Sequence, residues 1–199
     1  MTAKEYIKKN LNVPNVLTMV RLLLVPVYIV LFVRGLKYPA LIIFLVASFT
    51  DLLDGIIARK YHLITDFGKL MDPFADKIMV LTAMFSMTLG NAQIPAVIPL
   101  PAVLVLLLKE LIMIVGGVLL LKRGIVVYSF MIGKVAQCIF IASLVLTFFH
   151  DWFVSVCPGW FMTPDVLLIW AAVACTLCAL VVYAIDALKK VKAAEPQGT

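Results

Sequence analysis

Four aspartates in two consecutive apolar stretches are the residues whose type and spacing best suit chemistry. Asp51 and Asp54 lie three positions apart, and Asp72 and Asp76 lie four positions apart in the next stretch. On a helix, residues three or four apart share a face, so each stretch would present two carboxylates together. Carboxylate oxygens are the ligands that Mg²⁺ and Mn²⁺ prefer. The spacing therefore predicts a divalent metal site built from two helices.

Small residues are interleaved with these aspartates. Gly55 and Ala58 follow the first pair at helical spacing, and Gly68 and Ala75 lie on the expected face of the second pair. Because such residues let a bulky ligand approach the backbone, and Mg²⁺ in proteins commonly binds substrate phosphates as well, the pattern favours a phosphate-bearing ligand. The alternative is that the aspartates form buried salt bridges with nearby basic residues, which are Arg59, Lys69 and Lys77.

The elements that must position the aspartates are predicted to be membrane-spanning helices. The chain has 199 residues, of which 64% are hydrophobic and 14% are charged. An ordinary soluble domain is about 45–50% apolar and about 25% charged. The long runs are apolar on every face, which is typical of helical spans and not of alternating strands. This composition excludes a soluble globular enzyme and predicts an all-α membrane protein.

Charged residues, prolines and glycines divide the sequence into six predicted spans with both termini in the cytoplasm. Lys and Arg gather in alternate loops, eleven on one side against two on the other, and cytoplasmic loops carry such an excess. The loops at residues 90–93 and 150–163 carry none, which supports six spans. The predicted spans cover residues 16–33, 38–59, 68–89, 94–121, 126–149 and 164–188.

We expect one six-helix domain over residues 13–190. Residues 1–12 would form an amphipathic helix on the membrane surface, and residues 191–199 a disordered tail. The aspartate-bearing helices are joined by only residues 60–67, so they would be antiparallel neighbours that bring the aspartates together near the cytoplasmic end. Topology and anionic headgroups account for the net charge of +6, so no nucleic-acid partner is expected.

The aspartates belong to a motif that resembles the signature of the CDP-alcohol phosphotransferases. The segment D-L-L-D-G-I-I-A-R, eight further residues and G-K-L-M-D-P-F-A-D match D-x2-D-G-x2-A-R-x8-G-x3-D-x3-D at all eight defining positions. These positions are Asp51, Asp54, Gly55, Ala58, Arg59, Gly68, Asp72 and Asp76. The likeness extends through N-V-P-N-V-L-T-M-V-R-L-L-L-V-P near the start and G-K in the fifth span. It is closest to the bacterial members that make phosphatidylglycerophosphate.

The resemblance implies an enzyme that transfers a phosphatidyl group from CDP-diacylglycerol to a polar alcohol and releases CMP. Asp51, Asp54 and Asp72 would hold Mg²⁺ or Mn²⁺, as two ions, and Asp76 would be the catalytic base and also reach a metal. For Arg59 the alternative to a phosphate contact is anchoring at the cytoplasmic surface. The residues expected to bind the CDP-lipid are Asn15, Thr18, Asp54, Gly55, Ala58, Arg59 and Gly68.

Three basic residues from separate predicted spans suit an anionic acceptor. Arg21, Lys109 and Lys134 could together bind glycerol 3-phosphate, or each could be a counter-ion to an acidic neighbour such as Glu110. The family usually has Arg in place of Lys109 and G-K-x-K-T in the fifth span, where this chain reads G-K-V-A-Q. Glycerol 3-phosphate is the first choice of acceptor. Phosphatidylglycerol, as in a cardiolipin synthase, is the second, and inositol phosphate or serine follow.

A cation transporter is the alternative from a different functional class. It predicts acidic residues near the bilayer midplane and broken helices. Asp51 instead lies nine residues from Lys60, which is ~13 Å along a helix, from the expected cytoplasmic end of its span. We therefore expect a multi-pass enzyme of the cell membrane, active as a homodimer, with its site facing the cytoplasm.

Residues of the predicted loops have simpler interpretations. His62 and His150 have no carboxylate pattern around them in the sequence and are expected to be solvated. Trp152 and Trp160, each followed by a phenylalanine, are typical of the aromatic belt at a membrane interface.

Overall fold

The computed structural model describes residues 13–60, 66–122 and 131–194, which contain helices and turns and no strand. Within these helices, the side chains of residues 13, 14, 52, 54–60, 66–73, 76, 121, 122, 134 and 192–194 lie outside the described part. The prediction of an all-α chain is confirmed for the described residues. The predicted surface helix at residues 1–12 lies outside them.

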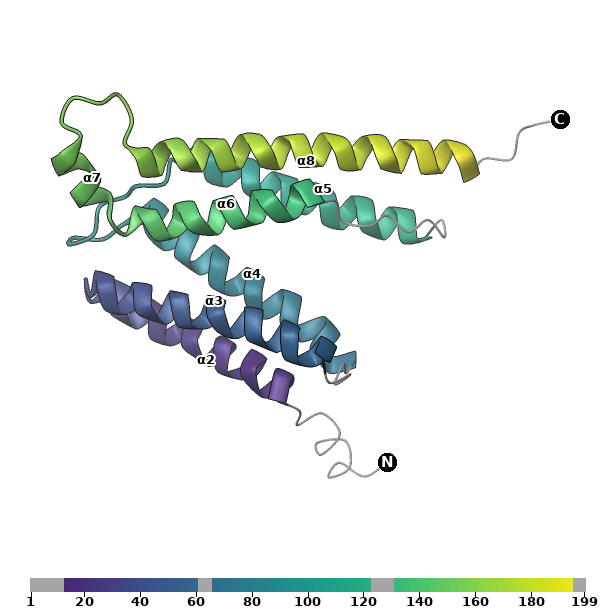
Figure 1. Ribbon diagram of the computed structural model, residues 1–199, viewed down its shortest axis with the longest axis horizontal. Helices are drawn as coiled ribbons and strands as arrows, with labels where there is room; N and C mark the ends of the chain where they lie inside the picture. Colours follow the sequence, from purple (N-terminus) through teal and green to yellow (C-terminus); the bar gives the residue numbers. More distant parts are fainter. Residues whose placement is uncertain (1–12, 61–65, 123–130, 195–199) are drawn as a thin grey trace. The chain divides into compact units, whose positions relative to one another are not determined.

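The chain divides into two compact units, Met1–Ala96 and Val97–Thr199, and each is described by itself. The helices described in the first unit are α2 (Val13–Val33), α3 (Lys37–Lys60) and α4 (Asp66–Leu89). Those of the second unit are α5 (Leu100–Lys122), α6 (Met131–Thr147), α7 (His150–Val156) and α8 (Pro164–Ala194) (Figure 1). The single domain expected over residues 13–190 stays a prediction.

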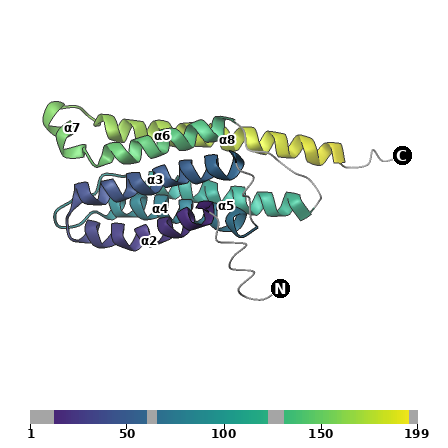
Figure 2. The same ribbon diagram turned by 60° about the horizontal axis from the view of Figure 1, so that its bottom comes forward.

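In the first unit, α2 packs against both α3 and α4, and the three helices lie together in both views (Figures 1 and 2). The core alternates large and small side chains. Tyr28 and Phe44 are fully buried, and so are four alanines of α3 and α4 at helical spacing, which are Ala40, Ala47, Ala75 and Ala83. Because alanine side chains are short, they let the helix backbones approach closely. In the second unit, α6 and α8 pack side by side and α5 contacts α8 (Figure 1).

The outward faces of these helices are strongly apolar. Leu23 is 69% exposed, Leu89 is 77% exposed and Leu119 is 57% exposed. A protein surrounded by water rarely exposes so many large apolar side chains. The exposed leucines therefore agree with helices that contact lipid.

Three of the described helices are long and apolar enough to cross a membrane. They contain the stretches Asn15–Val33, Leu100–Leu120 and Pro164–Val191. The pair α6 and α7 would make a fourth, although the two helices are bent by 74°. Helices α3 and α4 are 24 residues long and carry the charged motif. The six spans and the cytoplasmic termini stay predictions.

Three predicted boundaries differ from the structure. Helix α5 begins at Leu100 and not near residue 94, because Pro95 and Pro99 belong to a loop that follows Gly90. A short helix, α7, lies within the predicted loop at residues 150–163. Helix α8 continues to Ala194, so residues 191–194 of the predicted tail are helical, and residues 195–199 lie outside the described part.

The loop after α4 is organised by one asparagine side chain. Asn91 Oδ1 accepts hydrogen bonds from the backbone N–H groups of Gln93 (2.8 Å) and Ile94 (2.7 Å). Its Nδ2 donates to the carbonyl of Phe32, near the end of α2. Gly90 just before it has φ +62°, and a Cβ there would lie 2.7 Å from the backbone nitrogen of Ala96. The loop therefore joins the ends of α2 and α4 through polar contacts that an apolar residue could not make.

We expect Asn91→Ala to lower the free energy of unfolding in detergent by about 1–3 kcal/mol, because the carbonyl of Phe32 and two backbone N–H groups lose their partner. Ala92→Ser is the matched control. Ala92 lies in the same loop and is exposed, so the expected change is within about 0.5 kcal/mol. Equal thermal stability of the two variants would contradict the structural role of Asn91.

Candidate functional site

The acidic motif lies on two neighbouring helices of the first unit. Helix α3 carries its first half and ends at Lys60, and α4, which contacts α3, carries its second half from Asp66 onward. The motif positions on α3 are Asp51, Asp54, Gly55, Ala58 and Arg59, and those on α4 are Gly68, Asp72 and Asp76. Of these eight, only the side chain of Asp51 is among those described. The predicted roles of the other seven stay predictions.

Asp51 forms an ion pair with a buried arginine of α2. Arg21 Nη1 lies 2.7 Å from Asp51 Oδ1, and the side chains are 1% and 36% exposed respectively. Arg21 lies toward the beginning of α2 and Asp51 toward the end of α3, as two antiparallel helices require. A guanidinium removed from water is very costly unless an anion pairs with it. Asp51 therefore compensates the buried charge of Arg21.

This contact bears on the predicted acceptor pocket. Arg21 was expected either to bind the acceptor phosphate or to be a counter-ion, and the structure gives it Asp51 as an ionic partner. Lys109, on α5 of the second unit, has its Nζ 2.6 Å from Oε1 of the adjacent Glu110. The side chain of Lys134 lies outside the described part. The convergence of these three cations stays a prediction.

Two further polar residues of α2 are buried near Arg21 in the sequence. Asn15 is 4% exposed and Thr18 is fully buried. Farther along the same helix the buried side chains are Val25, Tyr28 and Phe32. The N-terminal half of α2 therefore buries polar groups and the C-terminal half buries apolar and aromatic ones. The predicted contact of Asn15 and Thr18 with the CDP-lipid stays a prediction.

The chemistry of the donor set fits a divalent cation. The motif supplies carboxylates from two contacting helices, and oxygen ligands of this kind suit Mg²⁺ or Mn²⁺. Asp51 uses Oδ1 for the ion pair with Arg21 and keeps about a third of its side chain accessible. Among the side chains that the structure describes, no three His, Cys, Asp or Glu residues gather into a metal-binding group. Asp54, Asp72 and Asp76 are not among those side chains.

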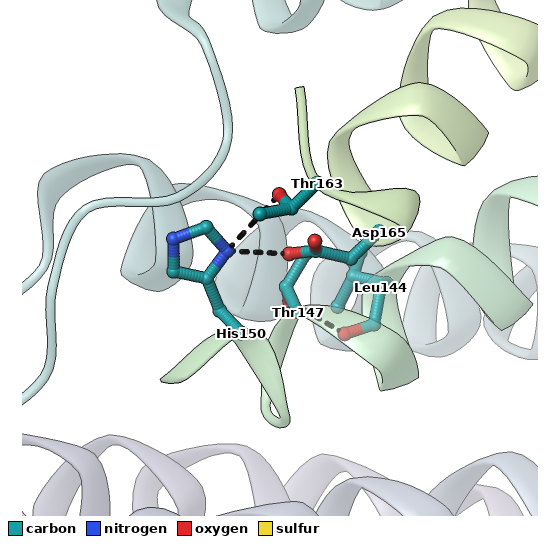
Figure 3. Close-up of polar contacts among 5 residues, drawn as sticks. All are labelled: Leu144, Thr147, His150, Thr163 and Asp165. Atoms are coloured by element: carbon teal, nitrogen blue, oxygen red, sulfur yellow. Dashed lines mark hydrogen bonds and ion pairs between the residues drawn. The ribbon is translucent and has the colours of Figure 1, made fainter. Parts of the chain in front are cut away.

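One polar cluster of the second unit was missed by the sequence analysis. His150 Nδ1 lies 2.8 Å from Asp165 Oδ2, and the side chains are 21% and 0% exposed (Figure 3). The prediction that His150 is solvated is therefore wrong. Its partner is fifteen residues away, at the start of α8, where local sequence gives no signal. His62 lies outside the described residues.

The sequence is similar to one known family over most of its length. A family model described as CDP-alcohol phosphatidyltransferase matches residues 11–183. A protein of Bacillus subtilis (strain 168) is 31% identical over 153 residues, which are 68% of this chain and 77% of that protein. Its name is CDP-diacylglycerol–glycerol-3-phosphate 3-phosphatidyltransferase.

Two relatives with the same name are more similar over shorter stretches. A protein of Rickettsia typhi is 51% identical over 73 residues, covering 35% of this chain and 40% of that protein. A protein of Escherichia coli (strain K12) is 40% identical over 80 residues, covering 39% and 44% respectively. The matches with these two relatives therefore span less than half of their length.

We expect Asp51→Asn to reduce the free energy of unfolding in detergent by about 1–3 kcal/mol, since it removes the carboxylate charge that lies 2.7 Å from the buried guanidinium of Arg21. Arg34→Met removes an exposed cation and should change stability by less than about 0.5 kcal/mol. In a cycle of the single variants Arg21→Met and Asp51→Leu and their double variant, the double variant should recover stability, with a coupling free energy of about 0.5–3 kcal/mol. Strict additivity of the two single changes would show that the pair contributes nothing.

Proposed function

This chain belongs to the CDP-alcohol phosphatidyltransferase family, and we propose that it transfers the phosphatidyl group of CDP-diacylglycerol to the hydroxyl of glycerol 3-phosphate. The products would be phosphatidylglycerophosphate and CMP. The observation that carries this proposal is the eight-position motif on the contacting helices α3 and α4, inside the matched range 11–183. The names of the relatives favour glycerol 3-phosphate as the acceptor.

In the proposed reaction, the acceptor oxygen attacks the phosphorus of the phosphatidyl group. The bond from that phosphorus to the bridging oxygen breaks, and the electron pair leaves with CMP. Asp76 takes the proton of the attacking hydroxyl as a general base. Arg59 contacts a phosphate of the donor, and the small residues Gly55 and Gly68 let the nucleotide lie close to α3 and α4.

The remaining aspartates have a binding role in this proposal. Asp51, Asp54 and Asp72, together with Asp76, would hold one or two Mg²⁺ or Mn²⁺ ions. A cation bound there would neutralise the diphosphate and stabilise the CMP leaving group. Arg21 is then a positioning residue for Asp51, because the 2.7 Å ion pair restrains the carboxylate from the side of α2.

We also propose that the chain spans the membrane six times, with the motif at the cytoplasmic side. At 24 residues each, α3 and α4 are about 36 Å long, which exceeds the hydrocarbon core of about 30 Å. The excess of Lys and Arg in alternate loops supports cytoplasmic termini. In this arrangement Asp51 and Asp76 lie about 13–15 Å from the cytoplasmic ends of α3 and α4, in the cytoplasmic half of their spans, which is the side from which a CDP-lipid presents its diphosphate.

Phosphatidylglycerol is the second candidate acceptor. The observation in its favour is the sequence G-K-V-A-Q at residues 133–137, which lacks the second lysine and the threonine usual in the family. A pocket with fewer cations would bind a small dianionic acceptor less tightly.

Purified protein should release CMP from CDP-diacylglycerol and form phosphatidylglycerophosphate when glycerol 3-phosphate is the acceptor. Lipid products are identified by mass spectrometry from parallel reactions with phosphatidylglycerol, inositol phosphate and serine. Cardiolipin as the main product would show that the acceptor is phosphatidylglycerol and not glycerol 3-phosphate. We expect EDTA to abolish CMP release and added Mg²⁺ or Mn²⁺ to restore it. Full activity in the presence of EDTA would contradict the proposed metal dependence.

Asp76→Asn should reduce turnover by about 10²–10⁴-fold, the usual contribution of a general base, while CDP-lipid binding stays largely intact. Asp54→Asn should weaken nucleotide binding itself, because it removes a carboxylate expected to hold the metal. Both are checked by measuring CMP release and, separately, the binding of labelled CDP-lipid. Equal losses of affinity in the two variants would contradict the division of roles.

A further inference from the structure

The chain bends sharply where α6 ends. Helix α6 ends at Thr147, α7 begins at His150, and the two helices form an angle of 74°. Helix α6 alone has 17 residues, about 25 Å, which nearly matches the thickness of a hydrocarbon core. If α6 crosses the membrane, α7 therefore runs close to the plane of the membrane at the end of that span.

The surface of α7 and of the turn after it is aromatic and exposed. Trp152 is 59% exposed, Trp160 is 62% exposed and Phe161 is fully exposed. No residue of α7 is buried. Residues 150–163 contain no Lys or Arg, and Asp151 is their one acidic residue. Trp side chains with an apolar body and a polar N–H are enriched at the headgroup level of membranes.

A polar contact fixes α7 at its first residue. A carboxylate can only accept hydrogen bonds, so His150 Nδ1–H donates to Asp165 Oδ2, at 2.8 Å. Asp165 is completely buried in the first turn of α8, and Thr163 Oγ1 lies 3.5 Å from the same ring nitrogen. The other ring nitrogen points away from Asp165 (Figure 3). The hydrogen bond therefore joins α7 to α8 although α7 buries none of its own side chains.

We propose that residues 150–161 form an interfacial anchor that lies in the membrane plane, with the bilayer interface as its partner, and that the hydrogen bond from His150 to Asp165 sets its orientation. Trp152, Trp160 and Phe161 insert at the boundary between headgroups and acyl chains. The bilayer is the occupant because this segment connects α6 and α8, and the span of α8 starts at Pro164, directly after it. The proposal concerns the second unit alone and does not depend on phosphatidyl transfer.

The depth of the two tryptophans tests the anchor. Trp160→Phe, Trp170→Phe leaves Trp152 as the single fluorophore, and Trp152→Phe, Trp170→Phe leaves Trp160. In mixed phosphatidylcholine and phosphatidylglycerol vesicles, we expect both to be quenched most by lipids brominated at the upper acyl carbons, as for an apolar face inserted about 5–10 Å below the headgroups. Acrylamide in the water should quench them weakly.

Three results would overturn the anchor. Strong acrylamide quenching without bromine quenching would place the segment in water. Maximal quenching by bromines near the chain ends would make it a re-entrant segment. Protection from both quenchers would mean that a protein surface covers it.

His150→Phe keeps an aromatic ring and removes the donor, and Asp165→Ala removes the acceptor. In the background with Trp152 alone, both should move the emission to longer wavelength and increase acrylamide quenching. Val154→Ile, at a residue of the same helix that is 49% exposed, keeps the apolar character of the surface, is the matched control and should change neither. A third background, Trp152→Phe, Trp160→Phe, leaves Trp170 as the single fluorophore. Its emission reports whether α8 stays packed in each variant. Unchanged depth of Trp152 in folded His150→Phe would falsify the role of the hydrogen bond, even if Asp165→Ala fails to fold.

Discussion

A positive charge buried between helices is the constraint on which the first unit depends. The guanidinium of Arg21 is almost completely removed from solvent, so its burial favours the rotation of α2 and α3 that brings the carboxylate of Asp51 to it. Asp51 is also the first residue of the acidic motif. The ion pair that helps to bury Arg21 therefore also favours one rotation of α3 about its axis. The helical positions of Asp54 and Gly55 follow from that rotation, because both lie on the same helix.

Polar contacts at helix ends recur in both units. Lipid tails are as apolar as leucine side chains, so the hydrophobic effect does not drive helices together in a membrane. Helix association there relies on close packing and on polar contacts. Asn91 joins the loop after α4 to the end of α2, and His150 joins α7 to the start of α8. Each contact involves residues that are distant in sequence or separated by a turn. The apolar faces can then remain exposed to lipid without loss of a defined structure.

The sequence predicted what depends on composition and local spacing. Apolar runs marked six of the seven described helices, and the motif placed the aspartates on α3 and α4. The sequence did not predict the features that depend on contacts between residues far apart in the chain. Hydropathy continues through Ile94 to Leu100, so this stretch resembled a helix, although Pro95 and Pro99 were a sequence signal for the loop that the hydrogen bonds of Asn91 organise. Helix α7 is too short for a periodic pattern. The partner of His150 could not be found from neighbouring residues, because the bend after α6 brings Asp165 to it.

The uncharged part of α8 matches the thickness of a membrane core. Twenty residues without a charge, 166–185, separate Asp165 from Asp186, and they measure about 30 Å, which equals a typical hydrocarbon core. Asp165 is held at one end by His150, and at the other Asp186 pairs with Lys190 at 2.9 Å. As a membrane span, α8 would therefore resist sliding along the membrane normal. A thicker or thinner bilayer would have to be met by tilt, and α6, which packs along α8, would tilt with it.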